Sequence, residues 1–120
     1  MKVGIIGSGG REHAICLSLI QSKNVKKVYC IPGNGGTSKI AKNINIEIDD
    51  FEKIKNFFLE EKIDLVVVGP EKPLVDGIVD FLENYNIKVF GPNKLASQLE
   101  GSKIFTKKIC EKYKIPTAKF

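Results

Sequence analysis

The sequence predicts an α/β fold in which five parallel strands form a doubly wound, Rossmann-like sheet in the order 3-2-1-4-5. Short apolar runs rich in Val and Ile alternate along the chain with amphipathic stretches of helical period, as repeated strand–helix–strand units do. Four of these runs end in turns that contain glycine. Right-handed connections then place the first and fourth strands side by side at the centre of the sheet.

The first strand is expected at Lys2–Ile6, where the apolar run KVGII stops at the glycine of position 7. Arg11–Ser22 carries most of its apolar residues on one side, which is typical of a helix packed on a sheet. Val25–Ile31 is the second strand, because it is apolar and is closed by the turn cluster Pro32–Gly36.

The middle of the chain continues the same alternation. A short helix is expected at Ser38–Lys42, and Asn43–Ile48 alternates polar and apolar residues as a third strand would. Asp49 or Asp50 is placed to cap a helix at Phe51–Glu61, whose apolar residues recur at helical spacing.

The second half predicts two more strands. Ile63–Val68 is the longest strongly apolar run, with one acid near its start, and it reads as a central strand covered on both faces. A helix at Leu74–Asn84 and a fifth strand at Ile87–Phe90 follow it. The remaining expectations are two helices divided at Gly101 and then an extended segment: Asn93–Leu99, Ser102–Lys114 and Ile115–Phe120.

Composition argues against several classes of function. The chain has 120 residues, enough for one domain, and a net charge of +5. Its lysines are scattered among acidic residues without interleaved aromatic residues, so we expect no nucleic-acid binding. No apolar run approaches the ~20 residues of a membrane span. Cys16, Cys30 and Cys110 are far apart and form no CxxC pair, so we expect reduced thiols, a cytoplasmic location and no metal site.

The turn Gly7-Ser8-Gly9-Gly10 is the leading candidate for a ligand site. Glycine permits a sharp turn and a close approach, and the first N–H groups of the following helix attract an anion. Arg11 comes next and is the only arginine beside eighteen lysines, so we expect its planar, bidentate geometry to be needed for a phosphate. The alternative is that these glycines serve close packing alone.

The same turn argues against a dinucleotide. Glu12 replaces the third glycine of GxGxxG, and the second strand ends in Pro32-Gly33-Asn34, where an acid that binds a ribose would be expected. The loop therefore predicts a seat for a single phosphate. His13, the only histidine, lies in the first helical turn, and packing or hydrogen bonding explains it better than catalysis because no nucleophile and carboxylate accompany it.

Glu71 follows the fourth strand and is therefore expected to emerge beside the Gly7–Gly10 turn. A carboxylate there would accept hydrogen bonds from two neighbouring hydroxyls, as on a ribose. The alternative is that it caps the helix near Leu74. Phosphate at one turn and hydroxyls at the next would suit a ribose 5-phosphate.

Five motifs occur in one order along residues 1–120. They are GSGGREHA, PGNGGT, VGPEKPLVDGI, FGP and LEGSKIFTKKICEKYKIPTAKF. With this set the chain resembles the N-terminal part of the phosphoribosylamine–glycine ligases (glycinamide ribonucleotide synthetases) of the ATP-grasp superfamily. The resemblance implies a pre-ATP-grasp domain of a purine-pathway ligase. Such an enzyme joins glycine to 5-phosphoribosylamine through a glycyl phosphate, while ATP gives ADP and phosphate.

The resemblance also implies site residues. On the 5-phosphoribosylamine side it implies Gly7, Gly9, Gly10, Arg11, Glu12, Pro32, Gly33, Asn34 and Glu71. Lys103 matches a lysine that ATP-grasp relatives direct at ATP phosphates. No catalytic residue or metal ligand is expected in this segment. ATP, Mg²⁺ (or Mn²⁺) and glycine would be bound mainly by further domains of such a ligase.

Enzymes of this family are several times longer than this chain. We therefore expect residues 1–101 to form a substrate-binding domain and residues 102–120 to lead into an ATP-grasp domain in cis. We expect no turnover by these 120 residues alone. Two alternatives stay open, which are the N-terminal domain of another ATP-grasp ligase and a stand-alone module that binds sugar phosphates or nucleotides without catalysis.

Overall fold

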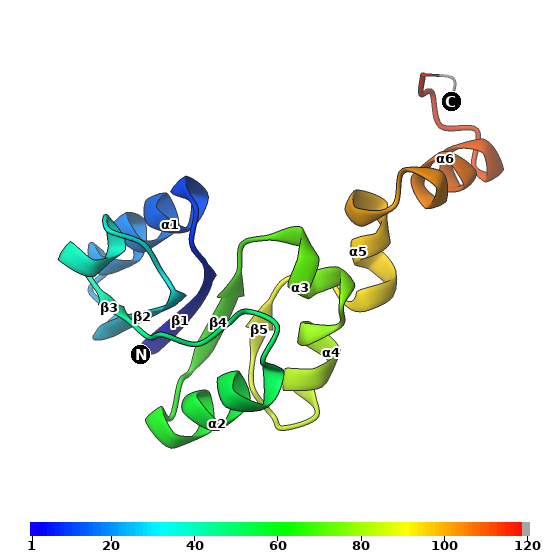
Figure 1. The fold of residues 1–120 in the computed structure, drawn as a ribbon. Coiled ribbons are helices and arrows are strands. Elements are labelled where there is room, and N and C mark those ends of the chain that lie inside the picture. Colours follow the sequence, from blue (N-terminus) through cyan, green and yellow to red (C-terminus); the bar gives the residue numbers. More distant parts are fainter. Residues whose placement is uncertain (119–120) are drawn as a thin grey trace.

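The computed structural model describes residues 1–118 and shows a parallel sheet with helices on both faces (Figure 1). The strands are β1 (Lys2–Gly7), β2 (Lys27–Pro32), β3 (Lys42–Asn43), β4 (Leu65–Val68) and β5 (Val89–Phe90). The helices are α1 (Gly10–Ile20), η1 (Thr37–Lys39, a 3₁₀ turn), α2 (Phe51–Glu61), α3 (Glu71–Val75), α4 (Ile78–Glu83), α5 (Lys94–Gly101) and α6 (Lys103–Lys112). The strand order is β3-β2-β1-β4-β5 with every pair parallel, which confirms the predicted fold class and order.

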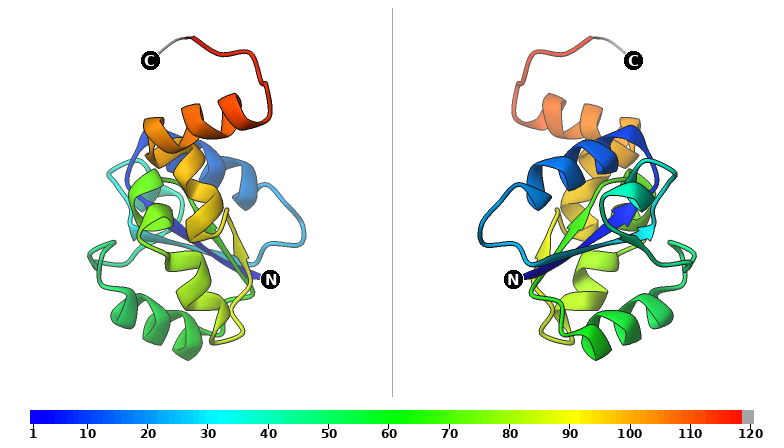
Figure 2. Two further views of the ribbon diagram at one scale, coloured as in Figure 1. Left: turned by 90° about the vertical axis from the view of Figure 1, so that its right-hand side faces the viewer. Right: turned by 90° about the vertical axis from the view of Figure 1, so that its left-hand side faces the viewer.

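Two apolar clusters hold the helices against the sheet. Successive residues of a strand point to opposite faces, so Ile5 and Ile6 of β1 belong to different clusters. The larger cluster joins β1, β2 and β4 to α2 and α4, with Phe58 of α2 almost fully buried. The smaller one packs Cys16 of α1 on β1 and β2. Figure 2 shows α1 on one side of the sheet and α2 and α4 on the other.

β4 is fully buried on one face and half-buried on the other, so the expectation that both faces are covered is wrong for the second face. Val66 and Val68 are buried under α2 and α4, whereas Leu65 and Val67 are half-buried. The reason is that α1 packs mainly over β1 and β2. Phe90, which lies next to Val67 in the register, is accordingly 71% exposed.

The expected third strand, residues 43–48, is also wrong in extent, because β3 has two residues. The N–H of Ile44 still donates to Cys30 O (2.8 Å), but the N–H of Ile46 donates to Ile44 O (2.8 Å), and this tight turn carries the chain away from β2. Ile44, Ile46 and Ile48 nevertheless pack on the larger cluster. The alternation of apolar residues here therefore indicates that one side of a connecting segment is buried. The short helix expected before it is the single 3₁₀ turn η1.

The helix expected at residues 74–84 is divided into α3 and α4. Gly77 lies between them with a φ of +93°, a left-handed conformation that ends the first helix. The division near the C-terminus is shifted by one residue from Gly101, which is the last residue of α5. Ser102 caps α6 instead, its hydroxyl accepting from the N–H of Phe105 (3.2 Å).

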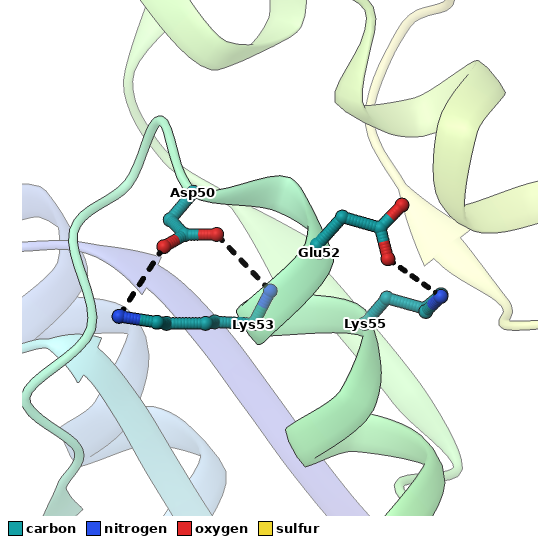
Figure 3. Close-up of polar contacts among 4 residues, drawn as sticks. All are labelled: Asp50, Glu52, Lys53 and Lys55. Carbon is teal, nitrogen blue, oxygen red and sulfur yellow. Dashed lines mark hydrogen bonds and ion pairs between the residues drawn. The ribbon is translucent and has the colours of Figure 1, made fainter.

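Helix α2 has the predicted bounds because its start is encoded locally (Figure 3). The Asp50 carboxylate accepts from the N–H of Lys53 (3.2 Å) and pairs with the ammonium of the same lysine (3.6 Å). Two residues further on, Lys55 pairs with Glu52 at 2.8 Å. Asp50, and not Asp49, is therefore the cap.

The cysteines are free thiols. Cys16 and Cys30 are buried with their sulfurs 4.0 Å apart, and burial raises the pKa of Cys16 and raises that of Cys30 to about 12. Within residues 1–118, no helix is long and apolar enough to cross a bilayer. Residues 115–118 lie outside helices and sheet, and the last two residues of the expected extended segment lie outside the described residues.

Candidate functional site

A pocket of about 320 Å³ opens at the carboxyl ends of β1 and β4, the central pair of strands. Its lining consists of Gly7, Ser8, Gly9, Gly10, Arg11, Glu12, Ile48, Pro70 and Glu71. The glycine turn and the turn after β4 therefore meet in one pocket, as the strand order predicts. Sequence reasoning missed Ile48 and Pro70. Pro70 lies in the VGPEKP motif and was findable, whereas Ile48 reaches the pocket only because of the path of residues 44–48.

The turn after β1 depends on glycine at one position above all. Gly7 has a φ of +134°, which side chains disfavour, and a Cβ there would overlap the Glu12 carboxylate. Gly9 is the N-cap of α1, and its carbonyl accepts from the N–H of His13 (3.1 Å). The first N–H groups of α1 have no partner within the helix, and Gly10 and Arg11, which carry two of them, line the pocket.

Glu12 is buried and stabilises this turn by a hydrogen bond. Its side chain is only 4% exposed, and its Oε2 accepts from the N–H of Gly9 (3.1 Å). The carboxylate fills the space beside two glycines, since a Cβ on either Gly7 or Gly69 would overlap it. Glu12, the residue that replaces the third glycine of a dinucleotide loop, therefore packs between the end of β1 and the end of β4.

Arg11 reaches across the pocket. Its side-chain Nη1 donates to the carbonyl of Gly69 (2.7 Å), so the guanidinium lies over the end of β4 and has further N–H groups for an anion. Among the described residues that line the pocket, Arg11 is the one cation, beside the acids Glu12 and Glu71. A bound phosphate would therefore depend on this side chain and on the start of α1.

Glu71 is exposed at the first position of α3, and within residues 1–118 its carboxylate accepts no hydrogen bond. The alternative that it caps the helix is not seen, because α3 begins after Pro70 without a side-chain cap. The neighbouring Lys72 pairs with Asp76 at 2.8 Å, and this hydrogen bond raises the pKa of Lys72. Glu71 is thus available at the pocket while the lysine beside it is engaged elsewhere.

The turn after β2 touches the glycine turn and does not line the pocket. Its Gly33, with a φ of +76°, donates its N–H to Gly7 O (3.1 Å), directly after Pro32. The side chain of Asn34 donates to two carbonyls of the glycine turn, those of Ser8 and Gly9.

His13 packs on this second turn as well. A Cβ on Gly36 would come within 2.7 Å of the Nδ1 of His13, so the imidazole lies flat against that glycine. This contact agrees with the expectation that His13 serves packing.

Lys103 is not brought to the pocket. It is exposed at the start of α6, which packs on α5 and extends away from the sheet (Figure 1). The structure shows no group of three or more His, Cys, Asp or Glu that could hold a metal ion among residues 1–118. A second hollow of about 380 Å³ beside β2 and β3 has aliphatic walls and four lysines but no acid, so it offers cations for a phosphate but no carboxylate for sugar hydroxyls.

Comparison with known proteins identifies relatives over the whole chain. A family model described as "Phosphoribosylglycinamide synthetase, N domain" matches residues 1–100. The phosphoribosylamine–glycine ligase of Caldanaerobacter subterraneus subsp. tengcongensis is 53% identical over 120 residues, and that of Clostridium acetobutylicum is 49% identical over 120 residues. The chain is fully covered in both alignments and spans 29% of the length of these relatives.

Solved structures agree with this result. The crystal structure of phosphoribosylamine–glycine ligase from Thermotoga maritima matches with a TM-score of 0.69 and 33% identity, covering 99% of this chain and 26% of that one. The biotin carboxylase domain of a thermophilic 2-oxoglutarate carboxylase matches with a TM-score of 0.71 and 19% identity, covering 97% of this chain and 28% of that one. The second likeness shows a shared fold alone.

Proposed function

The chain belongs to the phosphoribosylglycinamide synthetase N-domain family, and from that membership we propose that it forms the 5-phosphoribosylamine side of a phosphoribosylamine–glycine ligase. The full ligase would join glycine to 5-phosphoribosylamine, with hydrolysis of ATP to ADP and phosphate, in purine biosynthesis. The observation that carries this proposal is the pocket at β1 and β4. It brings the start of α1, the guanidinium of Arg11 and the carboxylate of Glu71 together in one small volume.

The pocket suits the two ends of a ribose 5-phosphate. The start of α1 and the Arg11 guanidinium would hold the phosphate, by unpaired N–H groups and by charge-assisted hydrogen bonds. Glu71 would accept hydrogen bonds from ribose hydroxyls at the other turn. Glu12 would keep the glycine turn in place, since its carboxylate is already bonded to Gly9 N. These residues bind and orient the amine, and we assign none of them a proton-transfer role.

ATP and Mg²⁺ (or Mn²⁺) would be bound mainly by the parts of such a ligase beyond the matched 120 residues. The described residues offer no group of three or more His, Cys, Asp or Glu side chains that could hold a metal ion. Lys103 would reach an ATP phosphate only if the rest of the ligase brings ATP to the start of α6. The free thiols support a cytoplasmic location.

We also propose that the substrate-binding domain comprises residues 1–101 and that residues 102–120 lead into the next domain. The family model stops at residue 100. Helix α6 has no buried residue and packs on α5, with Ile104 61% exposed and Tyr113 62% exposed.

The function is tested by ADP release from the full-length protein that carries this chain. We expect release to require both glycine and 5-phosphoribosylamine. Release that requires a different acid or acceptor would make the chain part of another ATP-grasp ligase. Binding of ribose 5-phosphate without any ADP release by the full-length protein would favour the binding module.

Glu71→Gln should raise the KM for 5-phosphoribosylamine about tenfold. Glutamine keeps the shape and one acceptor, but it removes the charge, which costs the hydroxyl bonds about 1–2 kcal/mol. The acid limb of the pH–rate profile should stay where it is, because Glu71 transfers no proton. The control is Glu83→Gln, because Glu83 is also an exposed carboxylate and lies on α4, where it does not line the pocket.

The measurement is steady-state kinetics over a range of pH, repeated with the 2-deoxyribose analogue. The mutant should lose most of the preference for ribose. Disappearance of the acid limb together with a collapse of turnover at saturating substrate would instead make Glu71 a proton-transfer residue.

A further inference from the structure

We propose that Asn34 is a positioning residue of the Gly7–Gly10 turn, the turn that would hold the phosphate. Together with Glu12 it holds the Ser8–Gly9 peptide at both of its ends, and it thereby keeps the N–H of Gly10 turned toward the pocket. This inference rests on the proposed function, since the loop matters only if it holds the substrate's phosphate. It gives Asn34 a task other than contact with the substrate, because Asn34 does not line the pocket.

The direction of the Asn34 amide is determined by its own turn. Its Oδ1 accepts from the N–H groups of Gly36 (2.8 Å) and Thr37 (2.9 Å), which are both donors and so require an oxygen there. The Nδ2 must therefore face the opposite way, toward the glycine turn. It donates to the carbonyls of Ser8 (3.0 Å) and Gly9 (3.2 Å).

The Ser8–Gly9 peptide is thus held at both ends. In a trans peptide the C=O and the N–H point in opposite directions. The oxygen of this peptide is bonded to Asn34, and its N–H is bonded to Glu12 at 3.1 Å. A peptide between glycine-rich neighbours turns over easily, because glycine tolerates both hands of φ. Such a turnover would direct the Ser8 carbonyl, a partial negative charge, toward the seat of the phosphate.

The next peptide follows the same logic. The carbonyl of Gly9 accepts from Asn34 and from the N–H of His13 (3.1 Å), so the N–H of Gly10 points the other way. Gly10 is the first residue of α1 and lines the pocket, and its N–H has no intrahelical partner. Asn34 therefore acts on an N–H that would meet the phosphate.

Asn34 is itself held in place by hydrogen bonds to residues of η1 and β3. The Oγ1 of Thr37, a fully buried residue, accepts from the N–H of Asn34 (2.8 Å) and donates to the Oδ1 of Asn43 (2.7 Å). The Nδ2 of Asn43, in β3, donates to the carbonyl of Asn34 (2.8 Å). This network ties the direction of the Asn34 side chain to the sheet.

The sharpest test is Asn34→Asp in the full-length protein. Aspartate still accepts from Gly36 and Thr37, so the turn should stay folded, but it cannot donate when ionised and places an oxygen against the two carbonyls. We expect the KM for 5-phosphoribosylamine to rise tenfold or more, on the order expected for two lost hydrogen bonds. The KM values for ATP and glycine should stay within about twofold, with the thermal midpoint near that of the wild type.

Two further variants separate positioning from stability. Asn34→Ala removes both halves of the amide and should lower the thermal midpoint as well as substrate use. Asn93→Ala is the matched control, because Asn93 also accepts a backbone N–H (Ala96, 2.8 Å) as the cap of α5 and does not line the pocket. It should cost stability without changing the KM for 5-phosphoribosylamine.

An unchanged KM for 5-phosphoribosylamine in Asn34→Asp would overturn the inference, as would an equal rise in all three KM values. If the wild-type protein shows no ADP release with glycine and 5-phosphoribosylamine, the proposed function fails instead. Crystal structures of the wild type and Asn34→Asp then decide the positioning role separately. A Ser8–Gly9 peptide that keeps its orientation in the variant would contradict it.

Discussion

Gly69→Ala should lower kcat/KM for 5-phosphoribosylamine about a hundredfold. It should lower the free energy of unfolding by less than the equivalent of that factor. The new Cβ would overlap the carboxylate of Glu12, lying 2.5 Å from its Cδ. Glu12 would have to leave its bond to Gly9 N, and the open direction for a buried side chain at this point is the pocket. The lost bond and the negative charge in the phosphate seat together cost about 3 kcal/mol.

Steady-state kinetics and thermal unfolding of the full-length protein check this result. Gly35→Ala is the control, because a Cβ there meets nothing within 4 Å and Gly35 does not line the pocket. A rescue experiment identifies the cause. In a Glu12→Ala background the overlap is gone, so adding Gly69→Ala should do little more. If Gly69→Ala is as harmful in that background as alone, displacement of Glu12 is not the mechanism.

Arg11→Ala should raise the KM for 5-phosphoribosylamine between tenfold and a hundredfold or more, while the KM for ATP changes little. The change removes the one cation among the described pocket-lining residues and leaves two carboxylates beside the phosphate. A charge-assisted bond of this kind contributes about 1.5–3 kcal/mol. Arg11→Ala also removes the hydrogen bond from Nη1 to the carbonyl of Gly69, which joins the two turns.

Arg11→Lys separates charge from shape. Lysine keeps the charge but has no planar fork that bonds Gly69 O and a phosphate together, so a loss of about 1–2 kcal/mol, roughly tenfold, is expected. Lys72→Ala is the control, since this cation is next to Glu71 but pairs with Asp76. Unchanged KM and turnover for 5-phosphoribosylamine in both Arg11 variants would make Arg11 an ordinary surface charge.

Much of the candidate site was predictable because it depends on two local signals. Glycine turns after apolar runs are visible in sequence, and the strand order follows from connection rules that hold for most α/β proteins. Together these place the Gly7–Gly10 turn beside Glu71, and the pocket does contain both. The unusual use of arginine at position 11 was a further local signal, and its guanidinium does lie at the pocket.

The tasks of Glu12 and Asn34 were not predictable from the same signals. Both occur in motifs that resemble a substrate-binding family, and motif position does not say whether a side chain faces the ligand or the loop behind it. Glu12 is buried between the ends of two strands, and Asn34 bonds a turn 25 residues before it in sequence. Such contacts exist only once β1, β2 and β4 are neighbours.

The sequence by itself determined the alternation of strands and helices and the bounds of α2, since these follow from periodicity, turn residues or a cap within a few positions. It also determined the parallel order of the sheet, through the connection rules that hold for most α/β proteins. Tertiary structure alone decided that residues 44–48 leave the sheet and that β4 is only half-buried on one face. It also decided that Glu12 and Asn34 bond the glycine turn from two sides. The physical reason is that an alternating apolar pattern indicates which side of a segment is buried but not which segment its backbone bonds. The hydrogen-bond partners of buried polar groups lie on segments that only folding brings together.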